Sequence, residues 1–126
     1  MKITGFRPLI VTKDPDAVIK TFEDLGFEKR HTKKDVEGGE NVTVVMKDAN
    51  GNRVNVAKAD GIPQDMTLIS INVDNFQEAY DFFIGKGFIN PRGEGRVTDT
   101  SSSRATALVS PSGFTVSISE HLKNRD

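Results

Sequence analysis

The sequence of 126 residues contains no cysteine, no tryptophan and a single tyrosine. Without cysteine the protein has no disulfide framework, thiol nucleophile or thiolate metal site, which fits a reducing compartment. The sequence also has no apolar run long enough to span a membrane, and its start lacks the apolar stretch of a signal peptide. We therefore expect a cytoplasmic protein with no membrane partner.

Charge of one sign is not in excess, because 17 basic residues face 18 acidic ones. This balance leaves no electrostatic footprint for nucleic acid. His31 and His121 are the two imidazoles, and neither has the spacing of a catalytic triad or of a His-x-x-x-His metal site. We interpret both as surface residues and assign no catalytic residue, although a non-standard metal site with either histidine stays open.

The first half of the chain reads as one strand, one helix and three strands. Asp14 suits the helix N-cap, Pro15 suits the first helical position and Gly26 suits the end. Val18, Phe22 and Leu25 recur on one helical face. The strands are expected at residues 3–12, 27–34, 42–47 and 52–58, with turns at 35–40 and 48–51.

The second half repeats this order after turn-forming residues at 60–65. Asn75 caps a second helix with apolar residues from Phe76 to Ile84, and Gly87 ends it. Further strands are expected at residues 66–73, from Phe88, within 91–103, at 104–109 and at 113–120. In the last strand, alternation places Phe114, Val116 and Ile118 on a core face and Thr115, Ser117 and Ser119 on the other.

A shift of about 61 positions superimposes Asp14 on Asn75 and Gly26 on Gly87, with the turns in the same order. We therefore predict an α+β fold of two βαβββ modules, with mixed curved sheets and helices on their outer face. The chain is interpreted as a single domain over residues 1–126. Module one covers about 1–60 and module two about 65–126.

Two such modules in a chain of this length resemble the vicinal oxygen chelate superfamily, which includes glyoxalase I, extradiol dioxygenases and bleomycin-resistance proteins. The resemblance rests on the strand-to-helix junctions, the Gly-Phe helix ends and the closing hairpins, at residues 10–14, 71–75, 26–27, 87–88, 48–56 and 110–118. It implies a homodimer, in which a partner covers part of residues 42–46 or 104–109. The sequence does not show whether the copies exchange modules.

In metal-dependent members of that superfamily, ligands come from positions that fall here on Arg7, Asn55, Leu68 and Ser117. Arginine has no lone pair to give, leucine has no donor atom, and neutral amide and hydroxyl oxygens bind divalent ions weakly. The usual metal site is therefore expected to be absent, and no cofactor is assigned. An enzyme is not favoured.

The resemblance also implies a cleft on the face that bears these positions. Its predicted ligand-binding residues are Arg7, Arg53, Asn55, Leu68, Ser70, Asn72, Thr115 and Ser117, with Leu9 and Ser119 beside them. Guanidinium groups bind carboxylate or phosphate in bidentate fashion, so this lining suits a small polar or anionic molecule. The alternative is that Arg7 and Arg53 pair with nearby surface acids.

Three classes of function follow. The leading hypothesis is a metal-independent small-molecule-binding protein that sequesters a polar or anionic ligand. A lyase, isomerase or dioxygenase with a displaced metal site is the alternative, and a protein-interaction module is a third. The sequence does not identify the ligand.

Overall fold

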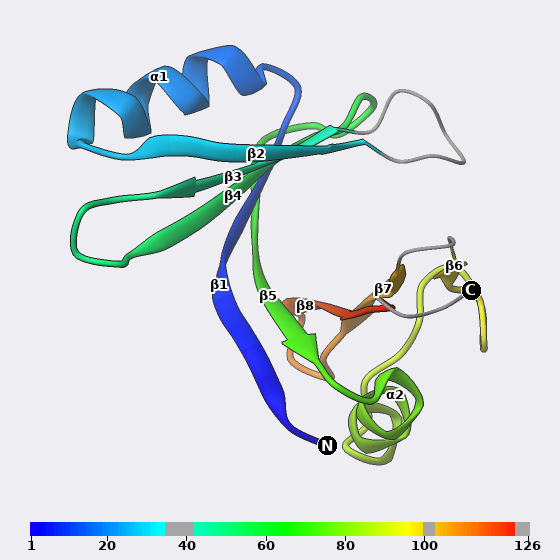
Figure 1. The fold of residues 1–126 in the computed structure, drawn as a ribbon. Coiled ribbons are helices and arrows are strands. Elements are labelled where there is room, and N and C mark those ends of the chain that lie inside the picture. The colour runs from blue at the N-terminus through cyan, green and yellow to red at the C-terminus, as the bar shows by residue number, and fades with distance from the viewer. Residues whose placement is uncertain (35–41, 100–102, 123–126) are drawn as a thin grey trace. The chain divides into compact units, whose positions relative to one another are not determined.

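The computed structural model describes residues 1–34, 42–99 and 103–122 (Figure 1). The predicted class is confirmed, because the chain is α+β and each half has the order βαβββ. The elements in chain order are β1 (Ile3–Thr12), α1 (Pro15–Leu25), β2 (Glu28–Lys34), β3 (Val42–Lys47), β4 (Arg53–Lys58), β5 (Met66–Val73), α2 (Phe76–Gly85), β6 (Thr98–Asp99), β7 (Ser103–Val109) and β8 (Thr115–His121). The turn predicted at 35–40 lies outside the described residues.

The chain divides into two compact units. Residues 7–67 form what we call the N-terminal unit, and residues 1–6 with 68–126 form the C-terminal unit. The strand order is β2-β3-β4-β1 in the first and β5-β8-β7-β6 in the second. In each unit one strand pair is parallel, β1 with β4 and β5 with β8, and the other pairs are antiparallel.

Helix α1 of the N-terminal unit begins and ends where its capping residues predict. The Asp14 carboxylate accepts a hydrogen bond from the Ala17 backbone N–H at 3.3 Å, and Gly26 ends the helix with a φ of 117°. Figure 1 shows α1 running along one face of its sheet. Its buried side chain, Ile19, packs in a core with Val44, Met46, Val54 and Val56. The prediction for Leu25 is wrong, because it is 70% exposed at the last turn.

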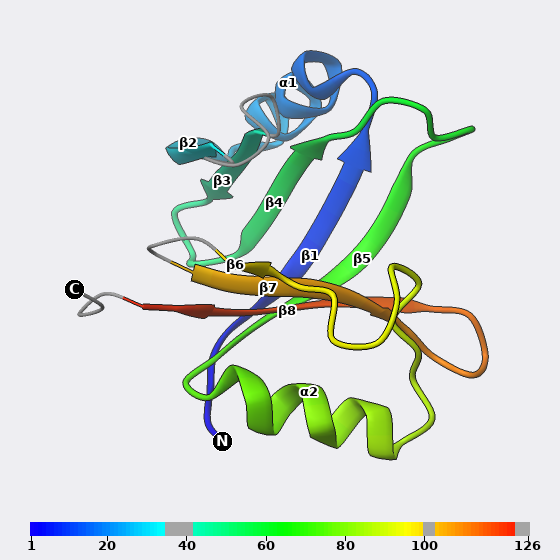
Figure 2. The same cartoon turned by 90° about the vertical axis from the view of Figure 1, so that its right-hand side faces the viewer.

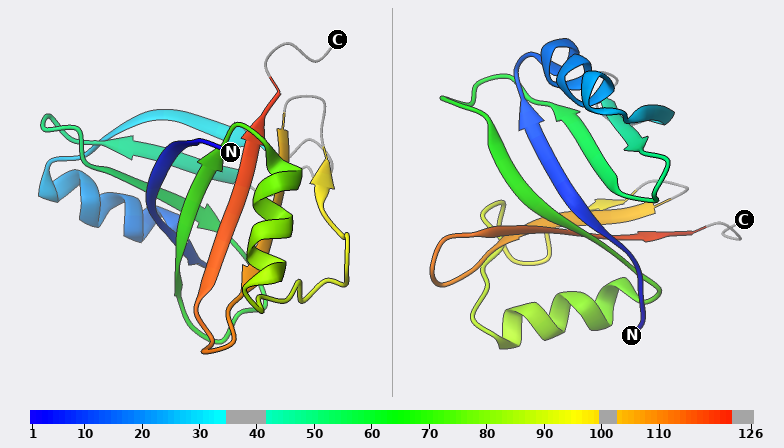
Figure 3. Two further views of the ribbon diagram at one scale, coloured as in Figure 1. Left: turned by 90° about the horizontal axis from the view of Figure 1, so that it is seen from below. Right: turned by 90° about the vertical axis from the view of Figure 1, so that its left-hand side faces the viewer.

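Helix α2 of the C-terminal unit lies along β8 and β7, as Figure 2 and the left view of Figure 3 show. Its Phe76, Ala79 and Tyr80 are buried against strand residues that include Val116 and Ile118. The predicted core position of Ile84 is wrong, because that side chain is exposed. Neither α1 nor α2, nor any other helix in the described ranges, is long and apolar enough to cross a membrane.

Two further expectations for the C-terminal unit are wrong. Phe88 does not start a strand, since only Ile89 forms an isolated bridge, with Val109. The adjoining loop is held instead by the Tyr80 hydroxyl, which accepts hydrogen bonds from the Gly95 N–H at 3.0 Å and the Asn90 amide at 3.3 Å. Phe114 precedes β8 and is 52% exposed, although its ring contacts that of Phe88 edge-to-face.

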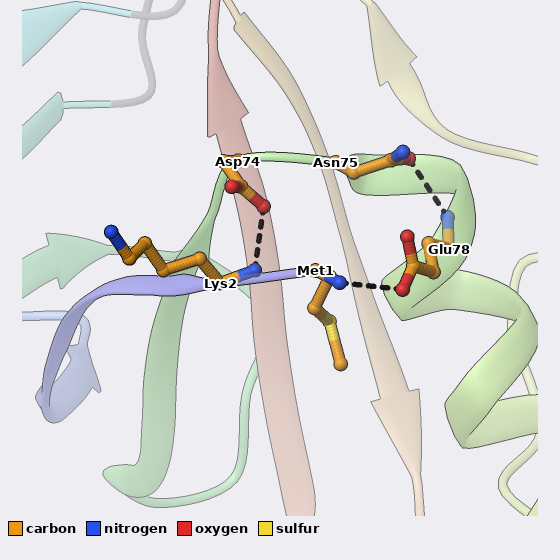
Figure 4. Close-up of polar contacts among 5 residues, drawn as sticks. All are labelled: Met1, Lys2, Asp74, Asn75 and Glu78. Carbon is orange, nitrogen blue, oxygen red and sulfur yellow. Dashed lines mark hydrogen bonds and ion pairs between the residues drawn. The ribbon is translucent and has the colours of Figure 1, made fainter.

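Hydrogen bonds and an ion pair connect the first residues of the chain to the start of α2 (Figure 4). The Lys2 N–H donates to the Asp74 carboxylate at 2.6 Å, and the Asp74 N–H donates to the Lys2 carbonyl at 3.0 Å. The Met1 amino group lies 2.5 Å from Glu78 Oε1, while the Glu78 N–H donates to the Asn75 side chain at 3.1 Å. These contacts explain why residues 1–6 group with the C-terminal unit.

Candidate functional site

The pairing of β1 with β4 places three predicted site residues on one face of the N-terminal unit. Leu9 pairs with Asn55, and the next pair, Ile10 with Val56, belongs to the face that α1 covers. Because side chains alternate along a strand, Asn55 points away from the helix. Arg7 and Arg53 lie two residues before Leu9 and Asn55, so they share that face.

Burial distinguishes the members of this set. Arg7 is 7% exposed and Asn55 is 8% exposed, whereas Arg53 is exposed. The Arg7 Nε and the Asn55 Oδ1 are both buried and have no hydrogen-bond partner within the described residues. Unsatisfied buried polar atoms are rare and costly, so each calls for a partner that protein atoms do not supply.

The electrostatics of this face favour an anion. Burial lowers the pKa of Arg7, and the neighbouring Arg53 guanidinium lowers it further. No carboxylate in the described parts of the chain forms an ion pair with either arginine. The alternative, that Arg7 and Arg53 pair with nearby acids, therefore finds no support there.

Sequence reasoning missed a third cation on this face. Lys47 of β3 pairs with Arg53 of β4, so Lys47, Arg53 and Arg7 lie on three neighbouring strands. Glu28 of β2 pairs in turn with Lys47 across the strands, but its carboxylate forms an ion pair with Arg30, at 3.9 Å. The alternation of side chains within Val42–Lys47 could have placed Lys47 on this face, because Val44 and Met46 face the helix and Lys47 therefore points to the other side.

The remaining predicted residues belong to the C-terminal unit and also share one face there. Ser70 pairs with Ser117 and Asn72 with Ser119, while Ile71 lies in the core beneath α2. The residues on this face are Leu68, Ser70, Asn72, Thr115, Ser117 and Ser119. Leu68 and Ser70 are buried, and the others are partly buried. That these residues share one cleft with Arg7 stays a prediction.

The polar face of the C-terminal unit satisfies part of its own hydrogen-bonding capacity. Ser119 Oγ donates to Asn72 Oδ1 at 2.6 Å. None of the side-chain atoms on this face is buried without a partner among the described residues. Of the two polar faces, the one in the N-terminal unit therefore holds the buried atoms that lack a partner, while the third such atom of the described residues, Arg104 Nε, lies on β7 outside the predicted site.

The residues at the usual metal-ligand positions do not fit a divalent cation. Arg7 supplies a buried positive charge, and Leu68 has no donor atom. Across the described ranges, no group of three His, Cys, Asp or Glu side chains is placed to hold a metal ion. His121 is exposed and is not a free side chain, and the His31 side chain lies outside the described part of the structure.

Comparison with known proteins defines the fold. No protein-family model matches the sequence. No curated protein matches it either. Among solved structures, a glyoxalase I mutant from Zea mays is similar, with a TM-score of 0.69 and 14% identity over 98% of this chain and 45% of that chain. This chain thus spans about half the length of the maize protein.

Two other solved structures are similar over most of both chains. Methylmalonyl-CoA epimerase from Mycobacterium tuberculosis has a TM-score of 0.69 and 13% identity over 94% of this chain and 88% of that chain. A glyoxalase/bleomycin resistance protein/dioxygenase superfamily member from Vibrio splendidus 12B01 has a TM-score of 0.61 and 15% identity, over 94% and 99%. The chain therefore has the vicinal oxygen chelate fold, as its sequence predicts.

Proposed function

We propose that this protein binds a small polar or anionic molecule without a metal ion. One observation carries the proposal: Arg7 is buried, its Nε has no hydrogen-bond partner in the described structure, and it stands where metal-dependent relatives of the fold are expected to hold a ligand. A buried guanidinium repels a divalent cation and attracts carboxylate or phosphate. Sequestration of such a ligand in the cytoplasm is part of the same proposal.

An enzyme remains the second candidate, because two of the similar structures are glyoxalase I and methylmalonyl-CoA epimerase. A lyase, isomerase or dioxygenase of this fold would need a displaced metal site. Because the described residues contain no suitable cluster, we favour the binding protein. A protein-interaction module would instead leave the purified chain unresponsive to small molecules.

A thermal-shift screen with carboxylates and phosphates, in the presence of EDTA, tests the proposal. A ligand that binds only the native state at 100 times its Kd adds about 2.7 kcal/mol to the free energy of unfolding. We expect at least one anion to raise the Tm, and the response to be lost in Arg7→Gln. Arg30→Gln is the matched control, since Arg30 is an exposed arginine of the same unit.

Metal analysis of the purified protein separates the two candidates. We expect no metal at stoichiometric levels and no loss of stability on chelation. Tightly held Zn, Mn, Ni or Fe at one equivalent per chain would favour the enzyme and overturn the metal-independent proposal.

A further inference from the structure

We propose that the N-terminal unit recognises an oxyanion that carries a hydrogen-bond donor beside it, such as a 2-hydroxy carboxylate or a hydroxyalkyl phosphate. This inference rests on the proposed function and adds the chemical class of the ligand. It comes from two unsatisfied buried atoms of opposite character on the same face. Arg7 Nε is a donor that lacks an acceptor, and Asn55 Oδ1 is an acceptor that lacks a donor.

The Arg7 side of this face supplies the charge. Arg7 and Arg53 are close enough for Arg53 to lower the pKa of Arg7, and they lie on adjacent parallel strands. Two guanidinium groups without a carboxylate partner among the described residues present several N–H donors to one oxyanion. Lys47, which pairs with Arg53, adds a third positive charge from β3.

The Asn55 side supplies an acceptor close to the anion. Leu9 pairs with Asn55, and Arg7 is two residues earlier on β1. Two residues span about 6.6 Å along a strand, and neighbouring strands lie about 4.8 Å apart. A flexible arginine side chain covers such a separation. A bound molecule that satisfies both atoms therefore needs its donor within a few bonds of its oxyanion.

The direct cross-strand neighbours of Asn55 supply no donor to its Oδ1. Val45, its neighbour on β3, is apolar and buried, and Leu9, its neighbour on β1, is apolar. The amide on the polar face of the C-terminal unit differs, because Asn72 Oδ1 accepts a hydrogen bond from Ser119. In the described structure, the Oδ1 atom of Asn55 is thus free to accept a hydrogen bond from a ligand.

Matched ligand pairs test this inference by calorimetry or thermal shift at low salt. Malate differs from succinate by one hydroxyl, and glycerol 3-phosphate differs from propyl phosphate in its hydroxyls. We expect the hydroxylated member to bind about three- to tenfold more tightly, the gain from one net hydrogen bond. The carboxylate pair and the phosphate pair show which oxyanion the site takes.

Variants at Arg7 and Asn55 test separately the binding of the oxyanion and the binding of the ligand hydroxyl. Arg7→Gln should abolish binding of both members of a pair. Asn55→Leu should retain succinate or propyl phosphate and lose the preference for the hydroxylated partner. Arg30→Gln should leave both affinities and their ratio unchanged, because Arg30 is exposed and forms an ion pair with Glu28.

The results separate this inference from the proposed function. If both members of a pair bind with equal affinity, the site does not recognise the ligand hydroxyl and the inference is wrong, whereas the proposed anion binding is supported. If Asn55→Leu still prefers the hydroxylated ligand, the inference is also overturned. If that variant fails to fold, the ratio of the two affinities in the wild-type protein is the test. If no oxyanion binds the wild-type protein, the inference and the anion-binding function both fail.

Discussion

Arg7 carries a cost for the fold that a ligand would offset. Its guanidinium loses hydration on burial, which is why its pKa is lowered, and its Nε has no partner within the described residues. A charged group in such surroundings destabilises the folded protein. Buried charged residues that lower the stability of a fold are typical of binding sites. Elsewhere in a protein, most residues favour the stability of the folded state.

We therefore expect Arg7→Met to stabilise the ligand-free protein while it removes anion binding. The methionine keeps the apolar stem and removes the buried charge. The gain should be roughly 0.5–2 kcal/mol, the usual size of such an improvement. Urea denaturation of both proteins measures it, and Arg30→Met is the control for loss of an exposed charge. A less stable Arg7→Met protein would show that Arg7 supports the fold instead.

Asp48 is the opposite case, because its neighbours stabilise its charged form. Its carboxylate accepts hydrogen bonds from the Asn52 side chain and backbone, both at 2.8 Å, and from the Asn50 N–H at 3.0 Å. The side-chain bond from Asn52 is the main reason that the pKa of Asp48 is lowered. These bonds hold the turn between β3 and β4.

The pH dependence at Asp48 has a defined sign. A pKa lowered by folding adds stability above the unfolded value, and this stability is lost as pH falls through the folded value. We expect wild type to be more stable than Asp48→Asn at neutral pH, with a stability gap that narrows as the pH falls through the lowered pKa of Asp48. Denaturation at a series of pH values measures the gap. A gap independent of pH would contradict the prediction.

At the scale of elements, capping residues and turns account for what could be predicted. Asp14 and Asn75 accept hydrogen bonds from the first turns of α1 and α2, and Gly26 ends α1, as local chemistry requires. The strand expected from Phe88 failed for a reason that is not local. The hydroxyl of Tyr80 and the amide of Asn90 bind the following loop, and no spacing in the sequence shows that contact.

The candidate site was predictable to a similar extent. Alternation along β4 places Arg53 and Asn55 on one face, and β1 adds Arg7 to it. It does not reveal that Arg7 and Asn55 are buried while Arg53 is exposed, because burial depends on residues distant in sequence. Alternation along β3 places Lys47 on the face away from α1, but only the register between β3 and β4 brings it beside Arg53, and the sequence does not give that register.

The chain just after α2 passes close to the turn between β7 and β8 at one glycine. Gly87 has a φ of 93°, and a Cβ added there would lie 3.0 Å from Pro111 Cγ. Gly95 is a matched position with a φ of 74° and no atom within 4 Å of an added Cβ. Both positions disfavour an L side chain, but only Gly87 adds a steric conflict.

We expect Gly87→Ala to destabilise the protein more than Gly95→Ala. Each substitution carries a conformational cost of about 1–2 kcal/mol for left-handed backbone. The contact with Pro111 should add about 1–3 kcal/mol at Gly87, the usual cost of overpacking. Urea denaturation of the two variants gives the difference directly. Equal losses would mean that the turn at Pro111 moves aside freely.

At the scale of the molecule, the two modules repeat a fold but differ in their polar faces. The C-terminal unit pairs Asn72 with Ser119, whereas Arg7 and Asn55 of the N-terminal unit keep buried atoms unpaired in the described structure. The two units thus have the same order of elements, but the positive charge on their polar faces is concentrated in the N-terminal unit. This asymmetry is why the proposed function depends on the N-terminal unit.

Association of two copies is the remaining expectation at this scale. β3 is an interior strand paired with β2 and β4, so a partner that covers residues 42–46 cannot pair with its backbone. Within residues 104–109 of β7, β6 pairs only with Arg104 and Ala105. The strand order ends at β2 and β6. β2 is rich in lysine and arginine, which disfavours edge-to-edge pairing. Apolar side chains elsewhere are better suited to an interface.

We expect a homodimer whose contact includes Phe6. This ring is 64% exposed, and Ile3 of the same segment is exposed as well. A buried phenylalanine contributes strongly to an interface, and two copies of one surface meet readily about a two-fold axis. Light scattering should give twice 13.8 kDa for the wild type. Phe6→Ser should shift the equilibrium toward monomer, whereas Leu25→Ser, at a leucine of α1 that is 70% exposed, should not. A wild-type chain that stays monomeric at every concentration would reject the dimer, and the anion site would then have to function within one chain.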